Sequence, residues 1–427
     1  MANRTAVMES KQAVEAPDRP PKVRPLANRN FRLLWIGESV SLFGDQFYLI
    51  ALPWLVFQLT GSALVFGTLL MVAGIPRAVF MLYGGVVTDR FSARTVMIVS
   101  NWLRLALTVL LLLLVAGQVV HVGLLFVIEF GFGLVDAFFY PAYRAVIPLI
   151  VEPDGLQASN ALHQGTSQLV QTAGPAIAGE MVRRVGVVVS FAFDAFTFLF
   201  TSIMLLMMSP AALPRQEAHP EGMQKRRRAL DEIGALLTYV RHDAFLSRLI
   251  LVVATINLVF AGPLIVGAAT LGKVRFSVEG SAAFGAMLST FSVGSMIGAL
   301  ASASVRSRWI GVISLLLLAV QGLLMVGLAF APTLLIACII MALMGLGAGF
   351  GSVSLITLTQ KRVAKEMMGR FMSLIALAEV GLVPISNALA GILADANVAL
   401  MYVLGGTLLT LTTLLALMSP TMRRGEA

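Results

Sequence analysis

The sequence predicts an all-α integral membrane protein with twelve transmembrane helices in two six-helix halves. Of its 427 residues, 58% are hydrophobic and only 12% are charged. A soluble domain has roughly 25% charged residues, so this composition cannot cover a water-facing surface. Apolar segments of membrane-spanning length recur along the chain, and one long polar interruption divides them near the midpoint. These three observations together predict the fold class.

A helix needs about 20 mostly apolar residues to cross a bilayer. Twelve segments meet this requirement: 31–57, 63–88, 94–116, 122–149, 159–182, 186–208, 245–270, 280–303, 308–330, 332–357, 371–394 and 398–418. We therefore expect five parts: a disordered tail without a signal peptide (1–30), an N-terminal bundle (31–208), a linker (209–244), a C-terminal bundle (245–418) and a short tail (419–427).

The linker contains the basic run Lys225–Arg228, followed by a segment whose apolar residues recur at helical spacing. A basic run beside a short amphipathic helix fits the anionic cytoplasmic surface of a membrane. Nucleic-acid binding is the rival interpretation, but membrane spans flank the run on both sides. We expect the lipid bilayer as a partner and no nucleic acid.

The basic residues also predict the orientation. Of the 31 Lys and Arg residues, 24 fall on the side that holds both termini and the linker, and four fall on the opposite side. The positive-inside rule then places both termini in the cytoplasm. The expected location is the cytoplasmic (inner) membrane of a prokaryote.

Residues 85–94 resemble the signature loop between helices 2 and 3 of the major facilitator superfamily. Gly85, Asp89, Arg90 and Arg94 match the motif, whereas Ser92 and Ala93 stand where the family has a glycine and an arginine. The resemblance implies a fold of two pseudo-twofold-related halves and a gating latch at this loop. It also implies that Arg104 is a partner of the latch. The alternative is a membrane anchor with an incidental acid.

A second motif, Gly174-Pro175 with Gly179, resembles the antiporter motif of the drug-efflux branches and favours export over import. Stretches such as Phe43-Gly44-Asp45 and Asp194-Ala195-Phe196-Thr197-Phe198 are similar to the macrolide-efflux branch of drug:proton antiporters. The resemblance covers nearly the whole chain after residue 30 and implies a monomer. Siderophore exporters and lysophospholipid flippases belong to similar groups, so the substrate stays open.

Four acids lie inside predicted spans, as two pairs seven residues apart and therefore each on one helix face. The pairs are Glu38 with Asp45 and Glu129 with Asp136. Family resemblance places both spans at the central cavity, where a carboxylate can serve as a proton carrier. All four are candidates for proton coupling, with Asp45 and Asp136 preferred and not separable. The alternative is a structural ion pair with Arg77 or Arg144.

Further polar and aromatic residues inside the spans are candidates for the walls of a substrate cavity. They are Arg144, Gln164, Gln168, Gln171, Asn257, Glu379, Asn387, Phe138, Phe139 and Tyr140. The glutamines could instead join helices, and the aromatic residues could simply pack. Asp194, by contrast, begins its span, and we expect it at a helix end near the outer surface.

The leading hypothesis is a secondary transporter that exports small, partly hydrophobic compounds by proton-coupled alternating access. No phosphate-binding loop, nucleophile constellation or metal-ligand cluster occurs, and Cys338 is the single cysteine. We therefore expect no catalytic residues, no cofactor and no metal, with the proton gradient as the energy source. The alternatives are a lipid flippase on the same fold and a membrane receptor or scaffold that transports nothing.

Overall fold

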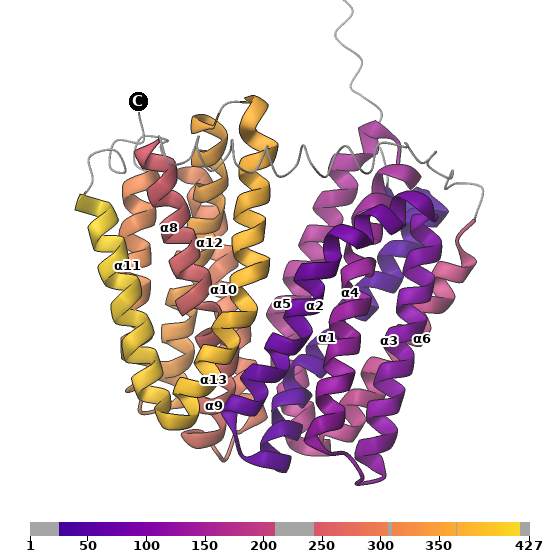
Figure 1. Ribbon diagram of the computed structural model, residues 1–427, viewed down its shortest axis with the longest axis horizontal. Helices are drawn as coiled ribbons and strands as arrows, with labels where there is room; N and C mark the ends of the chain where they lie inside the picture. The colour runs from indigo at the N-terminus through magenta and orange to yellow at the C-terminus, as the bar shows by residue number, and fades with distance from the viewer. Residues whose placement is uncertain (1–24, 210–242, 306–309, 364, 419–427) are drawn as a thin grey trace, which may run out of the picture.

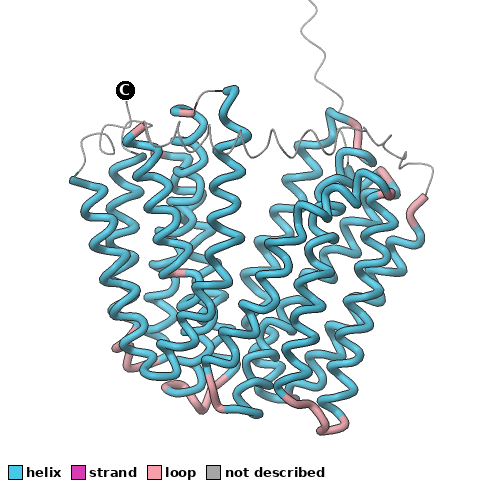
Figure 2. Tube along the Cα trace, in the orientation of Figure 1, coloured by secondary structure: helices cyan, strands magenta, loops and turns pink. Residues whose placement is uncertain are grey.

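The computed structural model describes residues 25–209, 243–305, 310–363 and 365–418. Most of the predicted N-terminal tail, the basic run of the linker and the C-terminal tail lie outside these ranges. Between them, the described residues form helices joined by short loops, with no strand (Figure 2).

Two helical bundles lie side by side (Figure 1). The first contains η1 (Pro25–Ala27), α1 (Arg29–Thr60), α2 (Ala63–Arg90), α3 (Ala93–Ala116), α4 (Val122–Ile150), η2 (Pro153–Gly155), α5 (Leu156–Val185) and α6 (Val187–Met207). The second contains α8 (Ala244–Val259), η4 (Pro263–Gly267), α9 (Ala268–Val274), α10 (Ser281–Ser304), α11 (Ile310–Leu328), α12 (Leu334–Arg362) and α13 (Lys365–Met418).

Ten helical segments in the described ranges are long and apolar enough to cross a membrane. α5 is not among them, although it has 30 residues, because its polar side chains lower its mean hydropathy. α13 runs over 54 residues, and two helices meet in it at Asn397, whose backbone is non-helical. The predicted twelve spans count α5 and both parts of α13, and that number stays a prediction.

Polar residues at the helix ends explain where several helices begin. Asn28, Ser62 and Asp243 accept hydrogen bonds from the first free backbone N–H groups of α1, α2 and α8. Ser92, which departs from the family motif, caps α3 in the same way by accepting a hydrogen bond from Thr95 N. A residue that weakens the motif therefore has a clear local role.

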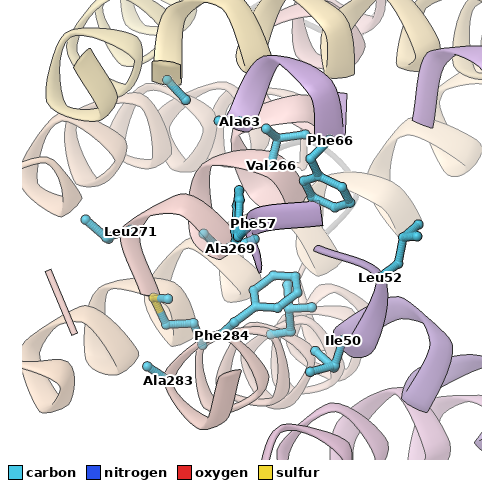
Figure 3. Packing of buried hydrophobic residues seen from close by; sticks show 14 of the residues in the cluster. Ile50, Leu52, Phe57, Ala63, Phe66, Val266, Ala269, Leu271, Ala283 and Phe284 are labelled. Atoms are coloured by element: carbon cyan, nitrogen blue, oxygen red, sulfur yellow. The ribbon is translucent and has the colours of Figure 1, made fainter. Parts of the chain in front are cut away.

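The largest apolar cluster joins the two bundles. It includes Ile50, Phe57, Phe66, Val266 and Phe284 (Figure 3). Two smaller clusters each stay within one half, and both lie toward the end of the molecule that bears the termini. The halves thus share a core at one end and have separate cores at the other. Figure 1 agrees, since the bundles are closer at the bottom of the view than at the top.

Small residues let α2 approach α4 closely. A Cβ atom at Gly84 would lie 2.1 Å from Ala137 O, whereas one at Gly85 would meet no atom within 4 Å. Gly85 is the glycine that matches the family motif, but in this conformation the close contact with α4 is made at Gly84. The contact falls on the neighbouring glycine because adjacent helical residues point about 100° apart.

We expect Gly84→Leu to lower the free energy of unfolding by about 1–3 kcal/mol or more, because the added side chain must displace the backbone of α4. Gly85→Leu is the matched control and should change stability by less than about 0.5 kcal/mol. Thermal unfolding of both variants in detergent measures the difference. Equal melting temperatures would show that α2 and α4 do not depend on this close approach.

Candidate transport cavity

A cavity of about 450 Å³ lies mainly within the N-terminal half. Six charged side chains line it: Asp45, Arg77, Arg104, Glu129, Asp136 and Asp194. They come from five different helices, α1, α2, α3, α4 and α6. Val383, Pro384 and Asn387 of α13 form part of the wall, so the cavity reaches the interface with the C-terminal half.

The carboxylate of Asp136 is shared by two arginines. Its Oδ2 accepts a hydrogen bond from Arg77 and its Oδ1 accepts one from Arg104. The Arg104 guanidinium also lies 3.8 Å from the ring centre of Phe139, and Tyr140 lies near both arginines. A buried charge needs such partners, because an unpaired one costs several kcal/mol. Asp136 therefore joins α2, α3 and α4.

The other predicted acids differ in their surroundings. Tyr48 of α1 donates a hydrogen bond to Glu129 Oε1, which ties this acid to a neighbouring helix. Asp45 lines the cavity and has no hydrogen-bond or ion-pair partner within the described ranges. Glu38 is buried but does not line the cavity, and its Oε1 has no hydrogen-bond partner among the described residues.

Asp194 corrects a sequence-based prediction. It was expected at a helix end near the outer surface, but its exposed fraction is 1% and it lines the cavity. Thr108 lies 3.5 Å from its Oδ2, whereas its Oδ1 has no partner in the described part of the chain. α6 begins at Val187, so Asp194 lies two turns inside the helix. The predicted span began at residue 186, so its boundary was right, and the error lay in treating a residue two turns inside it as a helix-end residue.

Arg104 also differs from the prediction. Family resemblance assigned it to the latch beside Asp89, but its guanidinium binds Asp136 in the cavity. Arg104 lies eleven residues into α3, roughly 17 Å along the helix axis from the latch loop. Arg94 donates to the backbone oxygens of Leu205 and Leu206 at the end of α6.

The remaining latch residues stay predictions. The side chain of Asp89 lies outside what the structure describes, and Arg90 is exposed at the end of α2. The latch itself is therefore untested in this conformation.

The three glutamines of α5 that were cavity candidates lie in different surroundings. Gln171 lines the cavity, whereas Gln168 Nε2 donates to Ser292 O of α10 and so links the two halves. Gln164 is exposed and lies outside the cavity wall, as does Arg144. Gln171 thus fits the cavity-wall alternative that the sequence left open, and Gln168 fits the alternative of a contact between helices.

The other cavity candidates fall in three places. Tyr140 and Asn387 line the charged cavity. Phe139 and Phe138 instead pack in or against the smaller N-terminal apolar cluster. Asn257 and Glu379 line a separate pocket in the C-terminal half.

The antiporter-like motif lies where α5 meets α10. A Cβ atom at Gly179 would lie 2.5 Å from Ser281 O, and one at Gly285 would lie 2.0 Å from Pro175 O. Gly174 makes a similar close contact with Gln46 of α1. Small residues therefore permit backbone contact between the halves, as is common between membrane helices.

Hydrogen bonds between the halves hold the end opposite the termini together. Asp395 of α13 accepts hydrogen bonds from Ser62 Oγ (2.8 Å) and Ala63 N (2.7 Å) at the start of α2. Lys273 of α9 donates to Gly61 O at 2.7 Å. A carboxylate from one half thus caps a helix of the other half, where the helix dipole favours negative charge. We call the contacts of Asp395 and Lys273 the outer clasp, a name that follows the orientation predicted from the basic residues.

Two bundles of membrane-length helices with a polar cavity that reaches their interface are typical of secondary transporters. The family described as "Transmembrane secretion effector" (MFS_3) matches residues 21–427. The chain belongs to this family, which confirms the resemblance inferred from the motifs.

Two bacterial relatives extend the comparison. The multidrug efflux pump Tap of Mycolicibacterium fortuitum is 27% identical over 367 residues, which cover 83% of this chain and 86% of that protein. Macrolide efflux protein A of Streptococcus pyogenes is 27% identical over 148 residues, 35% of this chain and 36% of that protein. The family and these relatives are transporters, not enzymes, as the sequence predicted.

Solved structures support the fold. A peptide transporter in complex with sulfate gives a TM-score of 0.72 at 14% identity and covers 96% of this chain and 97% of its own. An inward-facing bacterial homologue of the lysosomal transporter Spinster gives 0.66 at 13% identity, covering 94% and 97%. Identities this low bear on the fold alone.

We expect Asp136→Asn to lower the free energy of unfolding by about 3 kcal/mol, because it leaves the buried Arg104 guanidinium without its carboxylate. Arg77 is 38% exposed and adds less. Asp45→Asn breaks no ion pair and is the matched control. Unfolding in detergent compares the two variants, and equal losses would show that the shared carboxylate does not stabilise the bundle.

We expect Ser62→Cys with Asp395→Cys, in a Cys338→Ser background, to react with a short bis-methanethiosulfonate cross-linker, because the native side chains touch across the halves. Cross-linking should stop transport and a reducing agent should restore it. The two single-cysteine variants are the controls. Full transport by cross-linked protein would show that the outer clasp need not open.

Proposed function

We propose that this transporter exports small, partly hydrophobic compounds and that an inward flow of protons drives the export. The named relatives are efflux proteins, which favours this direction. The observation that carries the coupling is the concentration of acids in one cavity, of which Asp45 alone has neither an ion pair nor a hydrogen bond in the described ranges.

The ion pairs favour one of the two acids that the sequence left equal. Protonating Asp136 would break its contacts with Arg77 and Arg104. Protonating Asp45 breaks no ion pair, so a proton can bind and leave there without dismantling the bundle. We therefore propose Asp45 as the coupling acid and Asp136 as the anchor of the two arginines. Glu129 and Glu38 remain secondary candidates.

The proposed orientation rests on the distribution of basic residues. With both termini in the cytoplasm, the end held by the outer clasp faces outward and the end with separate cores faces the cytoplasm. This conformation would load substrate from the cytoplasm. We further propose a monomer in the cytoplasmic membrane of a prokaryote, working without metal or organic cofactor. The described residues hold no group of three or more His, Cys, Asp or Glu placed for a metal ion.

The test is efflux of ethidium and of a macrolide from cells that lack their own pumps. Wild type should extrude at least one compound, and a protonophore should abolish the efflux. Asp45→Asn should reduce efflux at least tenfold, because an amide at position 45 can neither bind nor release a proton.

Gln164→Asn is a suitable control, because this exposed side chain lies outside the cavity wall. Efflux by Asp45→Asn at the wild-type rate, still sensitive to the protonophore, would move the coupling role to another acid. No efflux by wild type of any compound in a broad panel would contradict drug export and favour the lipid-flippase alternative.

A further inference from the structure

A second cavity of about 220 Å³ lies inside the C-terminal half, between α8, α11, α12 and α13. It shares no lining residue with the charged cavity. Its walls are mostly apolar, with Phe245, Leu249, Leu315 and Leu358 on the side toward the termini. The roles assigned above to the charged cavity leave this pocket unused.

Three amide or carboxylate side chains line the pocket at comparable positions along their helices. Counted along each helix from the end on the side of the termini, Asn257, Gln321 and Glu379 lie at similar depths, roughly 17–21 Å. They come from three different helices, and all three line the pocket. The deeper part of the pocket therefore carries amide and carboxylate groups beside Phe260, and its shallower part is mostly apolar.

Two of these groups lack partners. Gln321 is 1% exposed, and its Oε1 has no hydrogen-bond partner within the described ranges. An unsatisfied buried acceptor costs roughly 1–3 kcal/mol, so a ligand that donates a hydrogen bond there would recover that cost. The Glu379 carboxylate is exposed and has no ion pair among the described residues. Both groups accept hydrogen bonds, and one of them carries negative charge.

We propose that this pocket binds a lipophilic amine, with the ammonium N–H groups at Gln321 and Glu379 and the apolar body along α8 and α11. Apolar walls with a few convergent polar groups are typical of small-molecule sites. A carboxylate selects a cation, and a buried acceptor selects a donor, so an ammonium satisfies both. The site goes beyond proton-driven export and does not depend on it.

The probe is dansylcadaverine, which carries an apolar fluorophore and a primary ammonium. N-pentyl dansylamide is the matched neutral probe. Binding to the purified full-length protein in detergent is measured by tryptophan-to-dansyl energy transfer, with protein-free micelles as the blank. This readout needs no transport, so the site and the proposed function can fail separately.

Gly351→Leu tests the location. Gly351 lines the pocket, and an added Cβ meets no atom within 4 Å, so a leucine can fill the space without moving the backbone. We expect the Kd of both probes to rise at least tenfold. Gly123→Leu is the control, since Gly123 is exposed in the other half and has equally open surroundings.

Glu379→Gln tests the chemistry. The Kd of dansylcadaverine should rise about tenfold, whereas that of N-pentyl dansylamide should stay within twofold. If Gly351→Leu leaves both Kd values unchanged, the pocket is not the binding site. If both probes bind the wild type equally tightly and Glu379→Gln affects neither, the pocket does not select an amine.

Discussion

The N-terminal half depends on one interaction, in which Arg77 and Arg104 both bind the carboxylate of Asp136. Two guanidiniums inside a membrane bundle are tolerable only when a carboxylate compensates them. The same interaction leaves Asp45 in the cavity without a cation of its own. The proposed coupling role of Asp45 depends on this arrangement, in which one acid holds the helices while another can change its charge.

The two halves differ in the chemistry of their interiors. The charged cavity gathers its acids and arginines from the N-terminal half, whereas the C-terminal pocket has apolar walls with Asn257, Gln321 and Glu379 among its few polar groups. The two halves have similar helical architecture, but the N-terminal half supplies charged groups and the C-terminal half supplies an apolar pocket. Pro384 and Asn387 of α13 reach from the second half into the first cavity, so movement of one half alters the surroundings of the other.

Periodicity and composition predicted the helices and most of the cavity acids, but they failed where side-chain direction decides. Spacing of seven put each acidic pair on one helix face, and family resemblance placed both pairs at the cavity, which Asp45, Glu129 and Asp136 line and Glu38 does not. Neither could say that Gly84 rather than Gly85 meets α4, since that depends on how the helix is rotated. Arg104 was misassigned for a related reason: pairing across helices depends on relative height, which one sequence does not contain.

Alternating access requires contacts between the halves that are specific but cheap to break. The outer clasp meets this need, because Asp395 and Lys273 lie near the surface and exchange their partners for water when the ends separate. The contact between α5 and α10 is backbone against backbone at Gly179 and Gly285, so separating the two helices there exposes few large apolar side chains to water. Bulky apolar side chains, with Trp54 of α1 and Phe284 of α10 among them, also join the halves. Separating the halves at this end therefore exposes that apolar contact to water, which costs free energy in addition to the exchange of polar partners.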